Sequence, residues 1–354
     1  MNKNLFSVTP LAALALLAAL PIGATPAAAP NYHVLQKVVL GGAGGWDYLM
    51  VDPVARRVYI SRSSHVMVVD ADTYKVVGDI PNTNGVHGIA VASVLGRGFT
   101  SNGRDNTVTI FDLKTLKTLG TVPVGTGPDA ILYEPKTQRV FTFNGGSDDA
   151  TVLDAKTGKV LGTIALGGRP EFAVADGTGM IYNNIEDKSE IAAIDAKTLT
   201  ITKRWPLAPA ESPSGIAMDT KTRRLFSTCD GGKMVISDAD AGRAVNTAPI
   251  GNGPDAAEFD PGTGLAFSSN GQDGTLTTIL PVVKHPQIVN GAMSLNTDIP
   301  TQSVKTQAGA RTMALDTKTH RVLLVTATPD VANPGEGRRS NYVPGSFTLI
   351  VVGP

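Results

Sequence analysis

The sequence predicts an all-β protein, a seven-bladed β-propeller with four antiparallel strands in each blade. First, the phrase GTGPDA at 125–130 returns as GNGPDA at 251–256, which is 126 positions later, or three repeats of 42. Second, short runs rich in Val, Ile, Thr and Phe alternate with turns that contain Gly and Asn, and no segment keeps helical periodicity. A repeat of this length, containing four strands, is typical of a propeller blade.

The first 29 residues are predicted to be a cleaved secretory signal peptide. They carry one charge, Lys3, followed by the apolar run LAALALLAAL (11–20) and the small residues ATPAAAP (24–30). The apolar run is shorter than the roughly 20 residues of a membrane-spanning helix; a retained membrane anchor is the alternative. We therefore expect residues 30–354 to form one exported, monomeric domain, periplasmic or secreted, without membrane insertion.

Seven copies of the repeat fill residues 41 to 354. They align on the residue that closes the first strand of each copy: Asp52, Ala92, Glu134, Asp176, Asp219, Asp260 and Asp316. The steps are 40 to 43 residues, except the last step of 56, which indicates an insertion near 284–296. In the second copy, the four strands are predicted at GIAVA (88–92), RGFTSN (97–102), NTVTIFD (106–112) and KTLGTVPV (117–124).

The two chain ends are predicted to complete one blade together. The seventh copy has three strands, RTMALD (311–316), RVLLVTA (321–327) and SFTLIVVG (346–353), and then the sequence ends. The segment YHVLQKVVL (32–40) has the pattern of a fourth strand. We expect it to close the ring and to remove an exposed sheet edge, whereas an open solenoid would leave the seventh copy unfinished.

Two long segments carry a resemblance to a known family. They are FTSNGRDNTVTIFDLKTLKTLGTVPVGTGPDAI (99–131) and FTFNGGSDDATVLDAKTGKVLGTIALGGRP (141–170). The repeat resembles the YVTN-repeat propeller family, which includes periplasmic YncE-like proteins, and the resemblance covers nearly the whole mature chain. It implies a propeller with a binding role, and single-stranded DNA binding is a role proposed for YncE-like proteins. A repeat motif specifies a fold and not a reaction.

Composition narrows the functional classes. A single cysteine, Cys229, excludes an internal disulfide, a cysteine-based zinc cluster and a CxxCH haem site. The formal net charge of zero gives no electrostatic signature of a nucleic-acid or membrane partner. No HExxH, GxSxG or phosphate-loop motif occurs. The sequence therefore favours a binding protein over an enzyme, and predicts no cofactor.

One repeat position is polar in all seven copies. It lies five residues before each closing residue and holds Asp47, His87, Asp129, Glu171, Ser214, Asp255 and Arg311. The position two residues further on is apolar throughout: Leu49, Ile89, Ile131, Ala173, Ile216, Ala257 and Met313. Strand periodicity predicts a polar ring above an apolar plug at the channel mouth. Converging carboxylates would have raised pKa values or hold a cation, and Arg311 could clamp an anion; the alternative is a solvated rim.

Three further features are candidates for the same mouth. Trp46 stands where other copies have proline, so it is either a stacking platform for a ligand or a filler between blades. Arg338, Arg339 and Tyr342 lie in a Pro- and Gly-rich loop that is either a lid, with a basic lip for an anionic ligand, or a mobile connection. A slot ending the second strands holds Asn102, Asn144 and Asn270, which suit Ca²⁺ ligation or, as Asn-Gly pairs, a tight turn.

The function expected from these features is the binding of a small molecule or a protein partner at the polar mouth, without catalysis. The first alternative is a lactonase-type hydrolase that uses a cation such as Ca²⁺ or the His87–carboxylate cluster. The second alternative is single-stranded DNA binding, which follows from the family resemblance and against which the neutral net charge argues.

Overall fold

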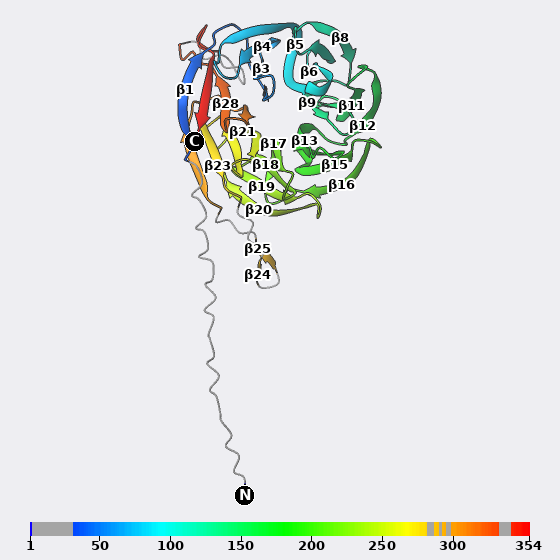
Figure 1. Ribbon diagram of the computed structural model, residues 1–354, viewed down its shortest axis with the longest axis vertical. Helices are drawn as coiled ribbons and strands as arrows, with labels where there is room; N and C mark the ends of the chain where they lie inside the picture. Colours follow the sequence, from blue (N-terminus) through cyan, green and yellow to red (C-terminus); the bar gives the residue numbers. More distant parts are fainter. Residues whose placement is uncertain (2–30, 282–286, 290–291, 295–298, 333–340) are drawn as a thin grey trace.

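The structure, a computed structural model, describes residues 1, 31–281, 287–289, 292–294, 299–332 and 341–354. Their strands form a ring of sheets, which confirms the β-propeller (Figure 1). Five blades are four-stranded sheets, and a seven-stranded sheet supplies two more because strand β5 belongs to both. The predicted signal peptide lies outside the described residues. No helix in the described part of the chain is long and apolar enough to cross a membrane.

Blades 1 and 2 form the continuous seven-stranded sheet. Its strands are β2 (Leu49–Asp52), β3 (Arg57–Ser61), β4 (Ser63–Asp70), β5 (Val76–Ala92), β6 (Arg97–Asn102), β7 (Thr107–Asp112) and β8 (Thr118–Pro123). The separate strands expected on either side of residue 85 are joined, because the segment between them also pairs with β4: Ser63 lies opposite Val86, and His65 lies opposite Pro81. A short 3₁₀ helix, η1 (Ser93–Leu95), links β5 to β6.

The next four blades follow the chain in order. Blade 3 contains β9 (Pro128–Glu134), β10 (Arg139–Asn144), β11 (Asp149–Asp154) and β12 (Val160–Ala165). Blade 4 contains β13 (Pro170–Ala175), β14 (Met180–Ile185), η2 (Glu186–Lys188), β15 (Glu190–Asp195) and β16 (Thr200–Pro206). Blade 5 contains β17 (Glu211–Asp219), β18 (Arg224–Asp230), β19 (Lys233–Asp238) and β20 (Arg243–Pro249). Blade 6 contains β21 (Pro254–Asp260), β22 (Leu265–Asn270), β23 (Thr275–Ile279) and β26 (Thr301–Lys305), and the predicted insertion supplies the hairpin β24 (Gln287–Val289) and β25 (Ala292–Ser294).

Blade 7 joins the two ends of the described chain, as predicted. It contains β27 (Met313–Asp316), β28 (Arg321–Thr326), β29 (Thr348–Gly353) and the N-terminal strand β1 (His33–Val39). Strands β1 and β29 are antiparallel, with His33 opposite Gly353 and Val39 opposite Thr348. In Figure 1, the blue strand β1 lies beside the red C-terminal end of the chain. The ring is therefore closed by hydrogen bonds between segments more than 300 residues apart.

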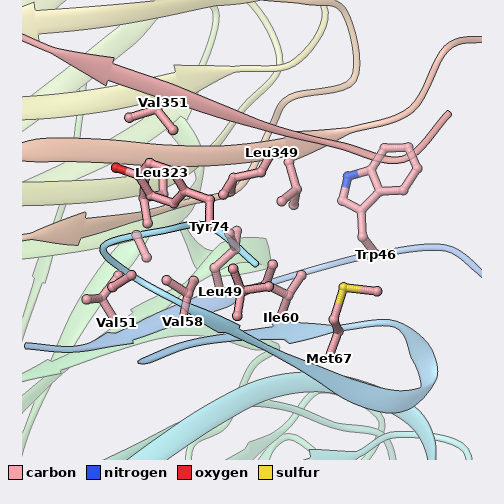
Figure 2. Close-up of a cluster of buried hydrophobic side chains, with 14 of the residues drawn as sticks. Trp46, Leu49, Val51, Val58, Ile60, Met67, Tyr74, Leu323, Leu349 and Val351 are labelled. Atoms are coloured by element: carbon pink, nitrogen blue, oxygen red, sulfur yellow. The ribbon is translucent and has the colours of Figure 1, made fainter. Parts of the chain in front are cut away.

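The hydrophobic core lies between neighbouring blades. Figure 2 shows one such cluster, in which Leu49 and Ile60 of blade 1 face Leu323 and Leu349 of blade 7. The predicted apolar ring does not form a single plug: its seven residues belong to seven different clusters, one in each gap between blades. Each inner strand packs against its neighbours in the ring, so apolar side chains at this position fill the gaps and not the channel.

The closing residues of the inner strands have a structural role in turns. Asp52, for example, accepts hydrogen bonds from the backbone N–H groups of Val54 and Ala55. Glu134, Asp176, Asp219, Asp260 and Asp316 accept equivalent bonds. Such local bonds are a common reason for an acidic residue in a turn. Ala92 lacks the oxygen, and η1 follows it instead.

The repeated phrase that marks the blades is a backbone joint. Gly127 in GTGPDA has a φ of +61°, and Gly253 in GNGPDA has a φ of +64°. This left-handed conformation favours glycine. The carbonyl groups of these two residues accept bonds from the N–H groups of Gly145 and Gly271, which tie each joint to the end of a second strand. Most of the phrase recurs because blades recur.

Candidate functional site

The predicted polar ring lies at the start of the inner strands. Asp129, Glu171 and Asp255 are each the second residue of their strand, and His87 lies within β5. The pairing of each of these strands with the second strand of its blade shifts register at this point. Such bulges re-aim side chains. For this reason, alternation along the strand does not give the direction in which each ring side chain points.

Five ring residues from five blades form a chain of ionic contacts. Asp47 is central: its Oδ2 is 2.6 Å from Nδ1 of His87, and its Oδ1 accepts a bond of 2.9 Å from Nη2 of Arg311. The Nε of Arg311 donates to Oδ2 of Asp255 at 2.6 Å. On the other side, Nδ1 of His87 lies 3.5 Å from Oδ1 of Asp129. The order around the mouth is therefore acid, base, acid, base, acid.

A tyrosine forms the floor of this group of charges. The ring of Tyr48 meets the ring of Phe172 across the channel, with centroids 3.8 Å apart, although the two residues lie in blades 1 and 4. The hydroxyl of Tyr48 donates to Oδ1 of Asp255 at 3.2 Å. Burial, together with the nearby carboxylates, raises the pKa of Tyr48 well above its ordinary value. The phenol is therefore a neutral hydrogen-bond donor beneath the ring.

The acidic members of the ring hold protons more tightly than free carboxyl groups do. Burial raises the pKa of Asp129 to about 6 and that of Asp255 to about 6, against the lowering effect of His87 or Arg311. Burial and the charge of Asp129 raise the pKa of Glu171 to about 9, and a hydrogen bond with Glu186 adds to the effect. At neutral pH, Glu171 is therefore protonated, while Asp129 and Asp255 are largely ionised.

The basic members stay charged. Burial lowers the pKa of His87, but its hydrogen bond to Asp47 and the charges of Asp129 and Asp47 together raise the pKa to about 9. The same kind of pairing with Asp47 and Asp255 outweighs burial at Arg311, so the guanidinium remains protonated. These contacts favour the charged form by placing carboxylates next to each cation. The mouth is therefore a cluster of paired charges in which the carboxylates are part-buried and the two cations are more than a third exposed.

Ser214 and Trp46 make contacts with neighbouring residues of the propeller itself. The hydroxyl of Ser214 bonds the carbonyl of Pro254 in the next blade at 3.1 Å and lies 3.3 Å from the hydroxyl of Thr228. Trp46 is 8% exposed. Its ring packs against Tyr342 and Phe347, with centroid distances of 4.7 and 5.6 Å, at the edge of the cluster in Figure 2. Trp46 is therefore a filler between blades, as one of the two alternatives predicted.

The predicted lid, residues 329–346, is described at its two ends, 329–332 and 341–346. Tyr342 is half-buried against Trp46 and forms a bridge with Pro329. Arg338 and Arg339 lie outside the described residues. The prediction of a basic lip by these two residues therefore stays a prediction.

The asparagine slot proves to be structural. The side-chain amide of Asn102 donates to the hydroxyls of Thr107 and Thr109 on the neighbouring strand. Asn144 and Asn270 donate in the same way to the third strands of their blades. These amides therefore hold the second strand to the third, a role that neither the Ca²⁺ alternative nor the tight-turn alternative predicted.

The strongest candidate for a metal centre lies in the ring itself. Asp47, His87 and Asp129 each place one potential ligand atom within 4.8 Å of the others. Nδ1 of His87 is already bonded to Asp47, and one oxygen of Asp47 is bonded to Arg311. A cation would have to displace the proton from His87 and share Asp47 with a guanidinium. Three groups with only two carboxylates also fall short of the six or more oxygens that Ca²⁺ takes.

Two cavities open near the mouth. The first, about 350 Å³, is lined by Asp47, His87, Arg104 and Arg311, with Trp46 and the backbone of glycine-rich loops. The second, about 430 Å³, is lined by Arg62, Tyr342, Phe347 and a loop that includes Gly42 and Gly44. Arg62 is fully buried there, donates to four backbone carbonyls of residues 41–45 and stacks on Phe347. Burial lowers the pKa of Arg62 to about 10.

Sequence reasoning missed Tyr48, Arg104 and Arg62. The sequence did contain a clue to Tyr48. An aromatic side chain at its repeat position must reach into the channel, since most blades have a small residue there, such as Gly88, Ala130 and Gly215. Arg62 also had one, because it stands in the slot that holds Asn102, Asn144 and Asn270 in three other blades. Arg104 had a signal of the same kind, because the equivalent position of this turn holds uncharged residues in blades 3 and 6, Gly146 and Gln272.

Comparisons with known proteins identify the fold. No family model and no curated protein matches the sequence. Kuenenia stuttgartiensis hydrazine synthase is similar in structure, with a TM-score of 0.70 at 14% identity over 79% of this chain and 92% of that chain. A chain of the mitotic checkpoint complex has a TM-score of 0.71 at 13% identity over 97% and 99%. The WD40 repeats of RRP9 have a TM-score of 0.68 at 10% identity over 92% and 99%.

Identities this low show a shared propeller fold and nothing about activity. Propeller folds of the WD40 type are confirmed as structural neighbours. Membership of the YVTN-repeat family stays a prediction.

Proposed function

We propose that this protein is a non-catalytic binding protein whose ligand or partner docks on the polar mouth of the propeller. One observation carries the proposal. Five charged side chains, contributed by five blades, form one continuous set of contacts beside a cavity. Gathering buried charges in this way costs stability unless every contact is good. A fold needs no such cluster, so its place in the ring points to recognition.

The direct test is a ligand screen with matched variants. Binding to the folded state raises the apparent stability. Thermal shifts of the mature protein should therefore be measured with sugars, lactones, metals, small anions, small cations and oligonucleotides. The mouth variant carries Asp129→Ala, Glu171→Ala and Asp255→Ala. The control carries Asp72→Ala, Asp79→Ala and Asp240→Ala, which remove three carboxylates that are at least half exposed and lie outside the ring.

The proposal expects at least one ligand class that stabilises the wild type and the control but not the mouth variant. It fails if every ligand that binds the wild type binds the mouth variant with unchanged affinity.

A hydrolase is the second candidate, and the cluster of Asp47, His87 and Asp129 favours it. In this version a cation, or His87 acting with a carboxylate, would activate water for attack on a lactone. Metal analysis of the purified protein and assays of lactone turnover separate it from the binding role. Bound metal with turnover that is lost in His87→Gln would support the hydrolase; turnover unaffected by this change would reject it.

Single-stranded DNA remains a candidate partner only through the family resemblance. Such binding depends on phosphate contacts and weakens steeply with salt. A salt-dependent oligonucleotide shift that is lost on changing Arg338 and Arg339 to Gln would support it.

We also propose export with removal of residues 1–29; N-terminal sequencing of the protein from fractionated cells tests this step.

A further inference from the structure

The smaller cavity at the mouth has the size and lining of a site for a small molecule. Its volume of about 350 Å³ lies at the low end of the range of ligand pockets, which begins at roughly 300 Å³. Its charged lining residues are Asp47, His87, Arg104 and Arg311. Three of these four carry a positive charge. The inference that follows rests on the proposed function and concerns the chemical class of the ligand.

The carboxylate oxygens near the cavity already accept hydrogen bonds from protein groups. Both oxygens of Asp47 are occupied, one by His87 and the other by Arg311. Asp255 accepts bonds from Arg311 and from the hydroxyl of Tyr48. A carboxylate whose two oxygens already bind cations has little remaining capacity to accept hydrogen bonds from a cationic ligand.

Several N–H donors that face the cavity, in contrast, have no hydrogen-bond partner among the described residues. In the described part of the chain, Nε2 of His87 and Nη1 of Arg311 have no hydrogen-bond partner, since these residues use Nδ1, Nε and Nη2 for their contacts. Arg104 is exposed and, within the same part of the chain, has neither an ion pair nor a side-chain hydrogen bond. An ionised donor that faces a cavity is matched best by an anionic oxygen.

The backbone keeps the imidazole accessible. A Cβ atom at Gly103 would lie 2.9 Å from Cδ2 and 3.0 Å from Nε2 of His87. Any other residue there would cover the edge of the ring that carries the free nitrogen. Glycine at this position therefore leaves Nε2 open to the cavity.

The remaining acidic residues of the ring do not oppose an anion in this cavity. Asp129 and Glu171 do not line it. Burial and its acidic neighbours raise the pKa of Glu171, which keeps this carboxyl neutral at pH 7. The pKa of His87, raised to about 9 by its contacts with Asp47 and Asp129 in spite of burial, keeps the imidazole positive. Among the residues that line the cavity, three cations therefore face one carboxylate, that of Asp47, while Asp129 and Asp255 contact His87 and Arg311 from outside the lining.

We propose that this cavity binds a small ligand through an oxyanion, a carboxylate or a phosphate group, held between Arg104, His87 and Arg311. Arg311 is oriented by its two carboxylate partners, so its free Nη1 is fixed in place before a ligand arrives. Such preorganisation reduces the cost of ordering the side chain on binding. Arg104 is the adjustable member, because among the described residues no ion pair or side-chain hydrogen bond holds its guanidinium.

Isothermal titration with inorganic phosphate, malonate and citrate, each at up to about 10 mM, tests the proposal. Methylammonium and glucose serve as cationic and neutral probes. The variants are Arg104→Gln and His87→Gln. The matched control is Arg97→Gln, which removes a cation from the opposite end of β6 in the same blade. Circular dichroism checks that each variant is folded.

The expected result is that at least one of the three anions binds the wild type and Arg97→Gln equally. Arg104→Gln and His87→Gln should each weaken its affinity about tenfold or more. Equal binding to all four proteins would overturn the proposal, because it would show an unspecific effect of the ion. If glucose or methylammonium binds in place of the anions, and this binding is lost in the mouth variant described above, the proposal that the ligand carries an oxyanion is overturned. The proposed function as a binding protein then still holds. Binding of no probe or screened ligand at the mouth would overturn both.

Discussion

Glu171, near the start of inner strand β13, and Asp176, directly after its end, are two carboxyl groups of one blade with opposite pKa shifts. Asp176, at the turn end, has a side chain 1% exposed, and it accepts bonds from the N–H groups of Thr178 and Met180 and from Arg223. These bonds lower its pKa in spite of burial. Glu171, at the mouth, is raised by burial and by the charge of Asp129 to a pKa of about 9.

The difference separates carboxylates that make the same structural bonds in every blade from carboxylates whose contacts differ from blade to blade. Carboxylates at the turn end are satisfied mostly by backbone of their own blade, and the same pattern recurs from blade to blade. Carboxylates at the mouth meet side chains of other blades, so each blade contributes a different group. Repetition therefore specifies the architecture, whereas variation at one repeated position specifies the site.

The largest effect is expected at the turn end. Asp176→Ala removes the partner of Arg223 and leaves the N–H groups of Thr178 and Met180 without an acceptor. Breaking a buried ion pair in this way should lower the free energy of unfolding by about 3 kcal/mol. Urea denaturation measures it, with Asp112→Ala, an exposed turn aspartate, as the control. A loss no larger than that of the control would contradict the comparison.

A smaller loss is expected from Arg311→Met at the mouth. The change leaves Asp47 and Asp255 facing each other without the shared cation, which should cost about 2 kcal/mol at pH 8. The pKa of Asp255 is about 6 with Arg311 present, and it should rise when the cation is removed. Protonation would then relieve the repulsion, so the difference from the wild type should shrink at pH 5. A loss that is the same at both pH values would show that Arg311 acts only by packing.

An increase in stability is expected from Glu171→Gln. The folded state binds a proton at Glu171 up to a pKa of about 9, whereas an unfolded glutamate loses it near its ordinary value of 4.5. The wild type therefore loses stability as the pH rises from about 4.5 to 9. Gln cannot ionise, so the variant should have a higher Tm at pH 8, by about 2 °C, and a smaller advantage at pH 5. A lower Tm at pH 8 would mean that the carboxyl is ionised and paired.

The smallest effect is expected from His87. Its folded pKa of about 9 lies above the ordinary value of 6.5, so its contribution is fully present below pH 6.5 and is lost as the pH rises through 9. The side chain is more than a third exposed, so solvent screening should keep the contribution below about 1 kcal/mol. Unfolding of the wild type and His87→Gln, compared at pH 6 and 9.5, measures it. A difference that grows with pH would contradict the assignment.

Much of the architecture could be predicted from the sequence, because each blade repeats the same strands and turns. The closing residues such as Asp52 and the joint at Gly127 mark every copy, and the N-terminal strand could be matched to the blade that lacked one. The members of the polar ring could be found from their repeat position.

Their contacts could not be predicted. Bulges at the start of the inner strands change the direction of side chains such as Asp255, and alternation therefore did not show that the apolar residues next to the ring fill the gaps between blades. Tyr48 and Phe172 meet across the channel only because the ring closes, which no local pattern records. Arg104 stands where the equivalent turns hold Gly146 and Gln272, but no local pattern shows that its side chain lines a cavity with His87 and Arg311.

The central claim is that the mouth is a cluster of coupled, part-buried charges whose acidic members are shielded from solvent. Carboxyl-carbon NMR titration of Glu171 and Asp176, assigned with Glu171→Gln and Asp176→Asn, tests it most directly. The account predicts that Glu171 titrates near pH 9 and that Asp176 titrates below its ordinary value. Titration of Glu171 near its ordinary value of 4.5 would contradict the claim and return the mouth to a solvated rim.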